Sequence, residues 1–248
     1  MRTLIVVPTH NEADNIAQLL DGLDRYVPDE HILVVDDASS DDTRAIVRAR
    51  ATTNPRITLV EREEKRGLGD AYLHAFKLAL ADGYDAVVEI DADLSHDPAV
   101  LPTMLDLARR EIAVVIGSRY IPGGSVVGWP RRRTWLSRWG NRYAAIALGL
   151  AINDATAGYR VYRAETLRRI DLDGIRAEGY GFQIEMTYRA VAAGCSIVEV
   201  PITFRDRVAG TSKMSGNIVS EAFLLVTWWA ISDAITFRRR RRAYADHE

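Results

Sequence analysis

The first part of the chain alternates between short runs of apolar residues and longer segments in which apolar residues recur at helical spacing. The short runs are rich in Val and Ile and carry apolar side chains on both faces, which is typical of strands covered by helices on both sides. A helix is predicted after each of the first four runs, the first over residues 12–26. This alternation indicates a doubly wound α/β fold with a parallel sheet over roughly residues 1–118. The predicted strands are residues 3–8, 31–37, 57–60, 86–90 and 112–116.

The pattern changes beyond Tyr120, where turns rich in glycine and proline precede a helix predicted from Arg131 to about residue 151. On this helix Trp135, Trp139 and Tyr143 recur at four-residue spacing among arginines. Such an aromatic stripe is either packed in the core or placed at a membrane surface, where indole and guanidinium groups suit the headgroup layer. Both interpretations stay open at this point. Further strands are predicted at 159–162, 196–200 and 202–205, and further helices at 164–170 and 182–193.

The last predicted element is a largely apolar helix over residues 218–237, followed by an arginine run at 238–242. Its longest charge-free stretch, residues 222–232, is about half as long as a bilayer crossing requires. We predict an amphipathic helix that lies on a membrane, with the arginine run against anionic headgroups. The alternative is a terminal helix docked on the domain and followed by a solvated basic tail.

Composition narrows the class of protein further. A chain of 248 residues can bury one large core. The formal net charge of −2 argues against a nucleic-acid partner. The single cysteine, Cys195, excludes an intramolecular disulfide, and the N-terminal apolar run at residues 4–7 is too short for a secretory signal. Both features favour a cytoplasmic protein.

The fourth predicted strand ends in two acids, Asp91 and Asp93. Side chains at i and i+2 of an extended segment point to the same side, so the two carboxylates can face one crevice. They would repel each other there unless a cation lies between them, and a hard divalent ion, Mg²⁺ or Mn²⁺, suits oxygen ligands. Open α/β sheets bind their ligands at this edge, beyond the carboxyl ends of the strands.

Other strand ends bring polar groups to the same edge: Glu12 after the first strand, Asp36 and Asp37 after the second, and Arg119 after the fifth. We expect a crevice that holds a nucleoside through carboxylate hydrogen bonds and its diphosphate through a bridging metal. Residues 8–12 lack the dinucleotide fingerprint, and no Gly-x-x-x-x-Gly-Lys loop occurs in the sequence. The pattern therefore favours a nucleotide-activated substrate over the substrates of nicotinamide or P-loop enzymes.

Several segments resemble the motifs of inverting family 2 glycosyltransferases of GT-A fold, in the same order and at matching spacing. Later segments are similar to those of dolichol- or polyprenol-phosphate mannosyltransferases, and the resemblance covers residues 2 to about 220. The first group comprises residues 7–12, 34–37, 65–68, 91–98 and 117–120, and the second comprises residues 129–133, 154–160, 181–185 and 200–213.

The resemblance implies a GT-A type, Rossmann-like doubly wound and mostly parallel sheet with C-terminal amphipathic helices. The implied reaction is inverting transfer of mannose from GDP-mannose to a polyprenyl phosphate at the cytoplasmic face of the membrane, giving a β-linked product. Whether a partner protein anchors the chain to the membrane is left open. The implied domains are a glycosyltransferase domain over residues 1–216, with a nucleotide-binding half at 1–118 and an acceptor half at 119–216, and a membrane-surface helix with a basic tail over residues 217–248.

The resemblance also implies roles for individual residues. His10 stands where the family often has tyrosine, Ser95 where a glutamine often completes the metal shell, and Gln183 where some members have lysine. A mobile lid is expected over residues 208–216. The implied donor-binding residues are Pro8, His10, Glu12, Val35, Asp37, Asp91, Ala92, Asp93, Arg119, Arg207 and Lys213; the metal ligands are Asp91, Asp93 and Ser95; the acceptor phosphate is bound by Arg119, Arg133 and Arg207; and the catalytic residues are Asp91, Asp93, Arg119 and Arg207.

Three alternatives remain at this stage. The same fold could use UDP-glucose or another nucleotide sugar, or a soluble hydroxyl acceptor, which would need a general base among Asp154, Glu185 and Asp206. A lipid phosphate needs no such base, because its second pKa of about 6 leaves it largely dianionic at neutral pH. A nucleotidyltransferase is less favoured, since residues 8–12 contain neither a glycine-rich loop nor a basic residue for a triphosphate. A non-catalytic membrane-binding module would leave the acids with purely structural roles.

Overall fold

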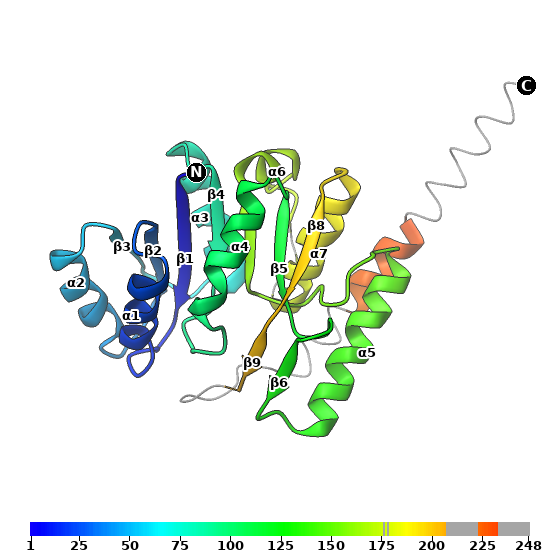
Figure 1. The fold of residues 1–248 in the computed structure, drawn as a ribbon, viewed down its shortest axis with the longest axis horizontal. Helices are drawn as coiled ribbons and strands as arrows, with labels where there is room; N and C mark the ends of the chain where they lie inside the picture. Colours follow the sequence, from blue (N-terminus) through cyan, green and yellow to red (C-terminus); the bar gives the residue numbers. More distant parts are fainter. Residues whose placement is uncertain (176, 178, 207–222, 233–248) are drawn as a thin grey trace, which may run out of the picture.

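The structure, a computed structural model, describes residues 1–175, 177, 179–206 and 223–232. In this part of the chain, a seven-stranded sheet forms the centre of the molecule and helices cover both of its faces (Figure 1). The sheet contains β1 (Thr3–Thr9), β2 (His31–Asp37), β3 (Ile57–Arg62), β4 (Ala86–Glu89), β5 (Val114–Ser118), β7 (Arg160–Arg163) and β8 (Ile197–Pro201), and β6 (Ser125–Val127) pairs separately with β9 (Thr203–Arg205). The helices are α1 (Ile16–Tyr26), α2 (Thr43–Thr53), α3 (Leu68–Ala81), the short 3₁₀ helix η1 (Pro98–Val100), α4 (Leu101–Arg109), α5 (Arg131–Ala147), α6 (Ala164–Arg169) and α7 (Gly179–Ala192).

The sheet is mostly parallel, as predicted, with the order β3-β2-β1-β4-β7-β5-β8. Its neighbouring strands run parallel except at β7, which is antiparallel to both β4 and β5. This strand comes from the later half of the chain and separates two strands that the sequence pattern would place side by side. An antiparallel strand needs no helical crossover, so its insertion leaves no trace in the alternation of strands and helices.

Alternate residues of β1 pack against different groups of helices. Leu4 and Val6 lie in the core under α3, α6 and α7, whereas Ile5 and Val7 lie in the core under α1, α2 and α4. Each of these side chains is at most 5% exposed. Because both faces of the sheet are covered, the polar side chains that serve a site collect where the strands end.

Local turns shift two of the predicted helix boundaries. Helix α1 begins at Ile16, because residues 13–15 form a turn in which the N–H of Asn15 donates to the carbonyl of Glu12 at 3.0 Å. Helix α5 ends at Ala147, shortly before Gly149, which has a φ of 64°. A positive φ interrupts helical geometry, so the turn at Gly149 limits α5.

Residues 223–232 are helical and form the described part of the predicted terminal helix (Figure 1). The rings of Tyr143 on α5 and Phe223 stack with centroids 4.6 Å apart, and the hydroxyl of Tyr143 lies 2.7 Å from Thr227 Oγ1. Trp229 stacks on Tyr188 of α7 at 5.8 Å. The described part of this helix is therefore docked on the domain. The other residues of the predicted helix and the arginine run lie outside the described residues.

The aromatic stripe of α5 lies largely on the surface. Trp135 is 67% exposed and Trp139 is 47% exposed, and on the neighbouring terminal helix Leu224 and Trp228 are 67% and 63% exposed. The core interpretation is therefore wrong for the two tryptophans of α5. Among the helices that the structure describes, none combines the length and apolarity needed to cross a bilayer.

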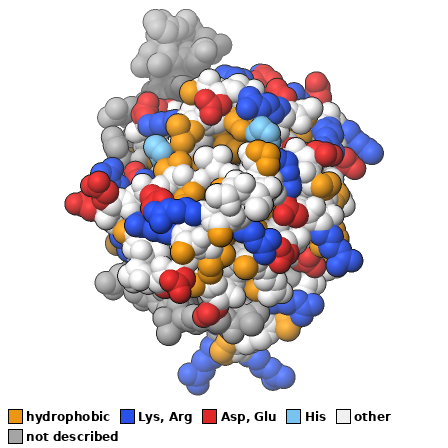
Figure 2. Space-filling model, turned by 90° about the vertical axis from the view of Figure 1, so that its left-hand side faces the viewer, with side chains coloured by type: hydrophobic (Ala, Val, Ile, Leu, Met, Phe, Trp, Pro, Cys, Tyr) orange, Lys and Arg blue, Asp and Glu red, His pale blue; other side chains and the backbone are white. Residues whose placement is uncertain are grey.

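The face of the molecule on the β3 side carries charges of both signs, since Lys and Arg are interspersed there with Asp and Glu (Figure 2).

Candidate functional site

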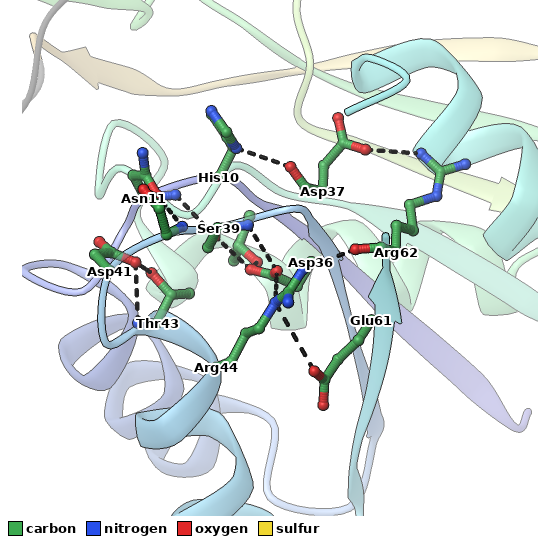
Figure 3. Close-up of polar contacts among 12 residues, drawn as sticks. His10, Asn11, Asp36, Asp37, Ser39, Asp41, Thr43, Arg44, Glu61 and Arg62 are labelled. Carbon is green, nitrogen blue, oxygen red and sulfur yellow. Dashed lines mark hydrogen bonds and ion pairs between the residues drawn. The ribbon is translucent and has the colours of Figure 1, made fainter. Parts of the chain in front are cut away.

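The two acids that end β2 have different roles. Asp36 is fully buried and accepts hydrogen bonds from Thr9 Oγ1 and the backbone N–H of Ser39, each at 3.0 Å, and from the guanidinium of Arg44 (Figure 3). Burial alone would raise the pKa of Asp36, but the hydrogen bonds from Ser39, Arg44 and Thr9 outweigh it and lower the pKa. The expectation that Asp36 faces the crevice is therefore wrong, because successive residues of a strand point to opposite sides.

Asp37 holds the turn that leads into α3. Its carboxylate accepts the backbone N–H groups of Arg66 and Gly67, each at 2.9 Å, and Arg62 Nη1 at 3.2 Å. Its backbone carbonyl lies 2.8 Å from His10 Nδ1, so this nitrogen carries the proton, since a carbonyl oxygen can only accept (Figure 3). The imidazole of His10 is thus fixed against the backbone of Asp37, at the ends of β1 and β2.

The remaining residues expected around the nucleoside are spread more widely. Pro8 is half-buried beside Val35 in the pairing of β1 with β2, but the Val35 side chain is fully buried in the core with α3 and does not line the edge of the sheet. Glu12 lies in the turn before α1, where its carboxylate accepts Asn15 Nδ2 at 3.0 Å and its backbone N–H donates to Thr43 Oγ1 at 2.9 Å. Of the residues expected around the nucleoside, Pro8, His10 and Asp37 are therefore the ones that lie close together.

Beyond β4 the chain makes a tight turn that carries the Asp-x-Asp pair. Asp93 is 4% exposed and its Oδ1 accepts the backbone N–H of Ser95 at 3.1 Å, while Leu94 between them has a φ of 62°. The side chain of Asp91 is 30% exposed. Ala92, between the two acids, is buried. The edge of the sheet therefore presents one partly open and one enclosed carboxylate.

His96 is a buried residue that packs against the turn carrying Asp91 and Asp93. It is 2% exposed and its ring stacks on that of Tyr159 at 4.9 Å. Burial lowers the pKa of His96 to about 4, an effect that the charge of Asp93 opposes and that of Arg119 reinforces, so the imidazole is neutral at pH 7. A neutral Nδ1 can accept the backbone N–H of Asp91, which lies 3.3 Å away. His96 therefore positions the turn rather than supplying a positive charge.

The oxygen atoms at this turn suit a divalent ion whose coordination shell is completed by atoms of the substrate. Within the described residues, no group of three or more His, Cys, Asp or Glu side chains could hold a metal alone. Mg²⁺ is usually bound by one or two carboxylates together with substrate phosphates and water, so a pair of aspartates is an ordinary protein share. The hydroxyl of Ser95 is buried and has no hydrogen-bond partner among the described residues. Asp91, Asp93 and Ser95 therefore supply hard oxygen atoms suited to Mg²⁺ or Mn²⁺.

A buried polar cluster behind Asp91 was missed by the sequence analysis. Glu89 is fully buried, and its carboxylate accepts Gln183 Nε2 at 2.9 Å. Burial raises the pKa of Glu89 to about 7, against smaller lowering effects from Arg160 and the hydrogen bond of Gln183. Arg160 is also fully buried and donates to the carbonyls of Ala155 and Ala157, each at 2.7 Å. An acid inside an apolar run that is covered on both faces is the signal that could have revealed this cluster.

Arg119, expected to bind phosphates, forms a buried ion pair. It is 4% exposed and donates from Nε and Nη2 to the two carboxylate oxygens of Asp154, at 2.7 and 2.6 Å. Asp154 is fully buried, and Thr156 Oγ1 accepts a further bond from Arg119 Nη2 at 2.7 Å. This guanidinium therefore organises the loops around the site in the described conformation, and a phosphate contact would need it to be shared with Asp154.

Arg133 is the other described arginine expected at the acceptor. Its guanidinium carbon lies 3.9 Å from the ring centroid of Trp129, and Nη1 lies 3.2 Å from Asp206 Oδ1. Two buried N–H groups, Arg133 Nε and Trp129 Nε1, have no hydrogen-bond partner among the described residues. Adjacent donors of this kind suit an anion. Arg207, Lys213 and the predicted lid at residues 208–216 lie outside the described residues.

Comparison with known proteins agrees with this arrangement. Residues 4–171 match the model of the family "Glycosyl transferase family 2". The chain is 50% identical over 232 residues to an undecaprenyl-phosphate mannosyltransferase of Micrococcus luteus, covering 94% of this chain and 95% of the relative. It is 47% identical over 231 residues to a polyprenol monophosphomannose synthase of Mycolicibacterium smegmatis, covering 93% and 87% of the two chains.

The fold is also found in solved structures of lower sequence identity. Glucosyl-3-phosphoglycerate synthase from Mycobacterium tuberculosis, in complex with Mn²⁺, UDP and phosphoglyceric acid, superimposes with a TM-score of 0.70 at 20% identity, covering 92% of this chain and 78% of that one. This likeness shows a shared GT-A-like fold. From the family match and the two relatives together, we conclude that the chain is a glycosyltransferase and belongs to glycosyl transferase family 2.

Proposed function

We propose that the protein transfers mannose from GDP-mannose to a polyprenyl phosphate, with inversion at the anomeric carbon, at the cytoplasmic face of a membrane. The observation that carries this proposal is the identity of 50% to a protein named undecaprenyl-phosphate mannosyltransferase, over 94% of this chain. Identity at this level over 94% of this chain and 95% of the relative supports a common donor and acceptor as well as a common fold.

The edge of the sheet suits a nucleotide sugar laid across the strand ends. In the proposed complex the nucleoside lies against Pro8, His10 and Asp37 at β1 and β2, and the diphosphate lies at Asp91 and Asp93 beyond β4. Asp91 and Asp93 would hold a divalent ion there, and its positive charge would stabilise the diphosphate as a leaving group. Neutral His96 keeps their turn in place without adding a competing charge.

The acids near the site favour a phosphate acceptor over a hydroxyl acceptor. A hydroxyl would need a general base, but Asp154 is paired with Arg119, Glu185 with Arg189 and Asp206 with Arg133. Each of these carboxylates is engaged by a guanidinium and is not positioned to take a proton from a hydroxyl. A phosphate monoester is already largely dianionic at neutral pH and can attack without a base.

The acceptor phosphate has a suitable place near Arg133. The N–H groups of Arg133 Nε and Trp129 Nε1 are both available to an anion in the described residues. Binding there would also draw Arg133 away from Asp206, which its Nη1 contacts at 3.2 Å. Arg119 and Arg207 complete the proposed phosphate contacts, and Lys213 with the lid at residues 208–216 would close over the donor.

The surface of α5 suits contact with a bilayer that holds the lipid tail. Trp135 and Trp139 are exposed, and so are the flanking Arg131, Arg132 and Arg138. Exposed indoles beside guanidinium groups match the interface between headgroups and acyl chains, where the rings bury apolar area and the arginines meet anionic phosphates. Trp228 of the neighbouring terminal helix is exposed as well.

Radiolabel transfer tests the proposal directly. The purified protein is incubated with Mg²⁺, a short-chain polyprenyl phosphate and labelled GDP-mannose, with labelled UDP-glucose in parallel, and label is counted in the organic phase. We expect transfer from GDP-mannose, a β-anomeric product by NMR, and loss of transfer with EDTA. Label reaching a soluble hydroxyl acceptor in place of the lipid would contradict the proposal.

A matched pair of variants separates catalysis from folding in this assay. Asp93→Asn removes a charge at the carboxyl end of β4 and should lower the rate about a hundredfold or more. Asp85→Asn removes an acid next to the opposite end of β4, where it accepts the backbone N–H of Arg2 at 2.7 Å. We expect that control to stay within about twofold of the wild type.

A further inference from the structure

A buried polar pair, Glu89 and Gln183, lies directly behind Asp91. Gln183 is 3% exposed, and its Nε2 donates to the carboxylate of the fully buried Glu89 at 2.9 Å. The backbone carbonyl of Gln183 accepts hydrogen bonds from Arg160 Nη1 at 3.0 Å and Thr187 Oγ1 at 2.9 Å. Both the backbone and the side chain of Gln183 are therefore fixed in place.

Gly158 brings this amide close to Asp91. A Cβ atom at Gly158 would lie 3.7 and 3.8 Å from the two carboxylate oxygens of Asp91, and 3.9 Å from Gln183 Nε2. The carboxylate and the amide therefore border the same small space, which glycine leaves open. A ligand whose phosphates lie at Asp91 brings its neighbouring atoms to Gln183.

The amide oxygen of Gln183 is an acceptor without a donor. Oε1 is buried, and none of the described residues gives it a hydrogen bond. An unsatisfied buried acceptor destabilises the empty site, so a ligand that donates a hydrogen bond to it gains affinity. The matching group must carry a hydrogen, because an ionised phosphate offers only oxygen lone pairs and would be repelled. A hydroxyl is the group of a nucleotide sugar that fits.

The order of the sheet distinguishes between the hydroxyls of the ribose and those of the sugar. β4 has β1 and β2 on one side and β7 on the other. His10 and Asp37, the residues proposed for the nucleoside, are on the β1 and β2 side, whereas Gly158 lies two residues before the start of β7 at Arg160. A donor whose diphosphate crosses the end of β4 therefore places its ribose away from Gln183 and its sugar towards it.

We propose that Gln183 is a specificity-determining residue that accepts a hydrogen bond from a hydroxyl of the transferred sugar, and that Glu89 is the positioning residue that holds its amide. This inference rests on the proposed function, because it requires a nucleotide sugar with its diphosphate at Asp91. It assigns Gln183 to the sugar and not to the phosphates, which a lysine at this position would suit better.

Isothermal titration with Mg²⁺ and without acceptor tests the role of Gln183. Gln183→Met keeps the length of the side chain and removes the amide. We expect its Kd for GDP-mannose to rise about tenfold while its Kd for GDP stays unchanged, since the loss of one net hydrogen bond is worth about that factor. The control, Thr166→Val, removes a buried hydroxyl of α6 that donates to the carbonyl of Ala113 at 3.0 Å, and it should leave the ratio of the two Kd values unchanged. Equal Kd ratios for wild type and Gln183→Met would overturn the inference.

Deoxy donors identify the hydroxyl. The analogues of GDP-mannose used here each lack one hydroxyl of the sugar. For the analogue that lacks the hydroxyl bound by Gln183, the Kd of the wild type should be about tenfold higher than its Kd for GDP-mannose. Gln183→Met should bind that analogue and GDP-mannose with the same Kd, because it has no amide left to accept the hydrogen bond. If the variant lost affinity for every analogue in the same proportion as the wild type, Gln183 would make no contact with the sugar.

Two variants of Glu89 test its positioning role. Glu89→Leu removes the acceptor of Gln183 Nε2 and should raise the Kd for GDP-mannose relative to GDP, as Gln183→Met does. Glu89→Gln restores an acceptor oxygen of the same reach and should recover the wild-type ratio. A purely structural role would change the melting temperature of Glu89→Leu without changing the ratio, and that result would remove Glu89 from the proposal.

Failure of the proposed function gives a different result. If the wild type transfers another sugar, the same comparison is made with that nucleotide sugar and its free nucleotide, and the inference stands or falls on the Kd ratio. If the wild type binds free nucleotide and nucleotide sugar equally, Gln183 has no sugar contact to lose and the inference is wrong whatever the reaction.

Discussion

The buried carboxyl of Glu89 makes the stability of the protein depend on pH. Burial raises its pKa from an ordinary value of 4.5 to about 7. In the unfolded chain this group loses its proton near pH 4.5, whereas in the folded protein it keeps the proton until about pH 7. Its contribution is therefore fully present below pH 4.5 and is lost as the pH rises through 7. The difference between the two pKa values corresponds to about 3 kcal/mol of unfolding free energy.

Glu89→Gln removes this dependence, because glutamine is neutral at every pH and can still accept from Gln183 Nε2. We expect the unfolding free energy of the variant, relative to wild type, to increase by about 3 kcal/mol between pH 4.5 and pH 8. The measurement is urea denaturation at a series of pH values, with EDTA present so that no metal binds at the neighbouring acids. A matched control is Glu165→Gln, since Glu165 is exposed on α6 and pairs with Arg169.

An unfolding free energy difference that does not depend on pH would refute the raised pKa of Glu89. If the free energy difference between Glu89→Gln and wild type were the same at pH 4.5 and pH 8, Glu89 would titrate near its ordinary value and the strand end would not be a low-dielectric environment. A change of similar size in Glu165→Gln would show that the effect belongs to the net charge of the protein and not to Glu89.

Three further predictions follow from other parts of the molecule. Arg119→Leu leaves the fully buried Asp154 without its cation and should lower the unfolding free energy by about 3–5 kcal/mol in urea denaturation, whereas an unchanged midpoint would contradict the buried pair. Replacing Trp135 and Trp139 by serine should reduce binding to anionic vesicles in a sedimentation assay by about tenfold to a hundredfold and leave the melting temperature near that of wild type, because both side chains are exposed. Gly158→Ala introduces no contact shorter than 3.7 Å, so it should change the unfolding free energy by less than about 1 kcal/mol, yet raise the Kd for GDP-mannose severalfold without affecting GDP; equal effects on both ligands would place the sugar elsewhere.

The acids of this protein divide into two groups with different chemistry. Asp36 and Asp154 are fully buried and hydrogen-bonded to arginines, so they hold strand ends and loops together. Asp91 is partly open and Asp93 lies in the same turn, with a buried hydroxyl from Ser95 that lacks a partner among the described residues. This separation is the physical basis for proposing a metal site at one turn although acids occur at several strand ends.

The sequence by itself determined the class of fold and predicted the edge of the sheet at which the site is proposed. Apolar runs without polar alternation identify strands covered on both faces, and the spacing of Asp91 and Asp93 places both after the fourth strand. These features depend on neighbouring residues along the chain, so the sequence pattern carries them. The likeness of the ordered motifs to family 2 glycosyltransferases was confirmed by the family match over residues 4–171.

Tertiary structure decided which polar residues face the site and which support it. Asp36 and Asp37 are adjacent in sequence, and it is the packing of Thr9, Ser39 and Arg44 around Asp36 that makes it structural. Arg119 and Asp154 are 35 residues apart, and Glu89 and Gln183 are 94 residues apart. The partner of a buried polar group is chosen by distant segments that the fold brings together, including the inserted antiparallel β7. Local periodicity carries no information about such pairs, because their energy depends on burial and contact that exist only in the folded chain.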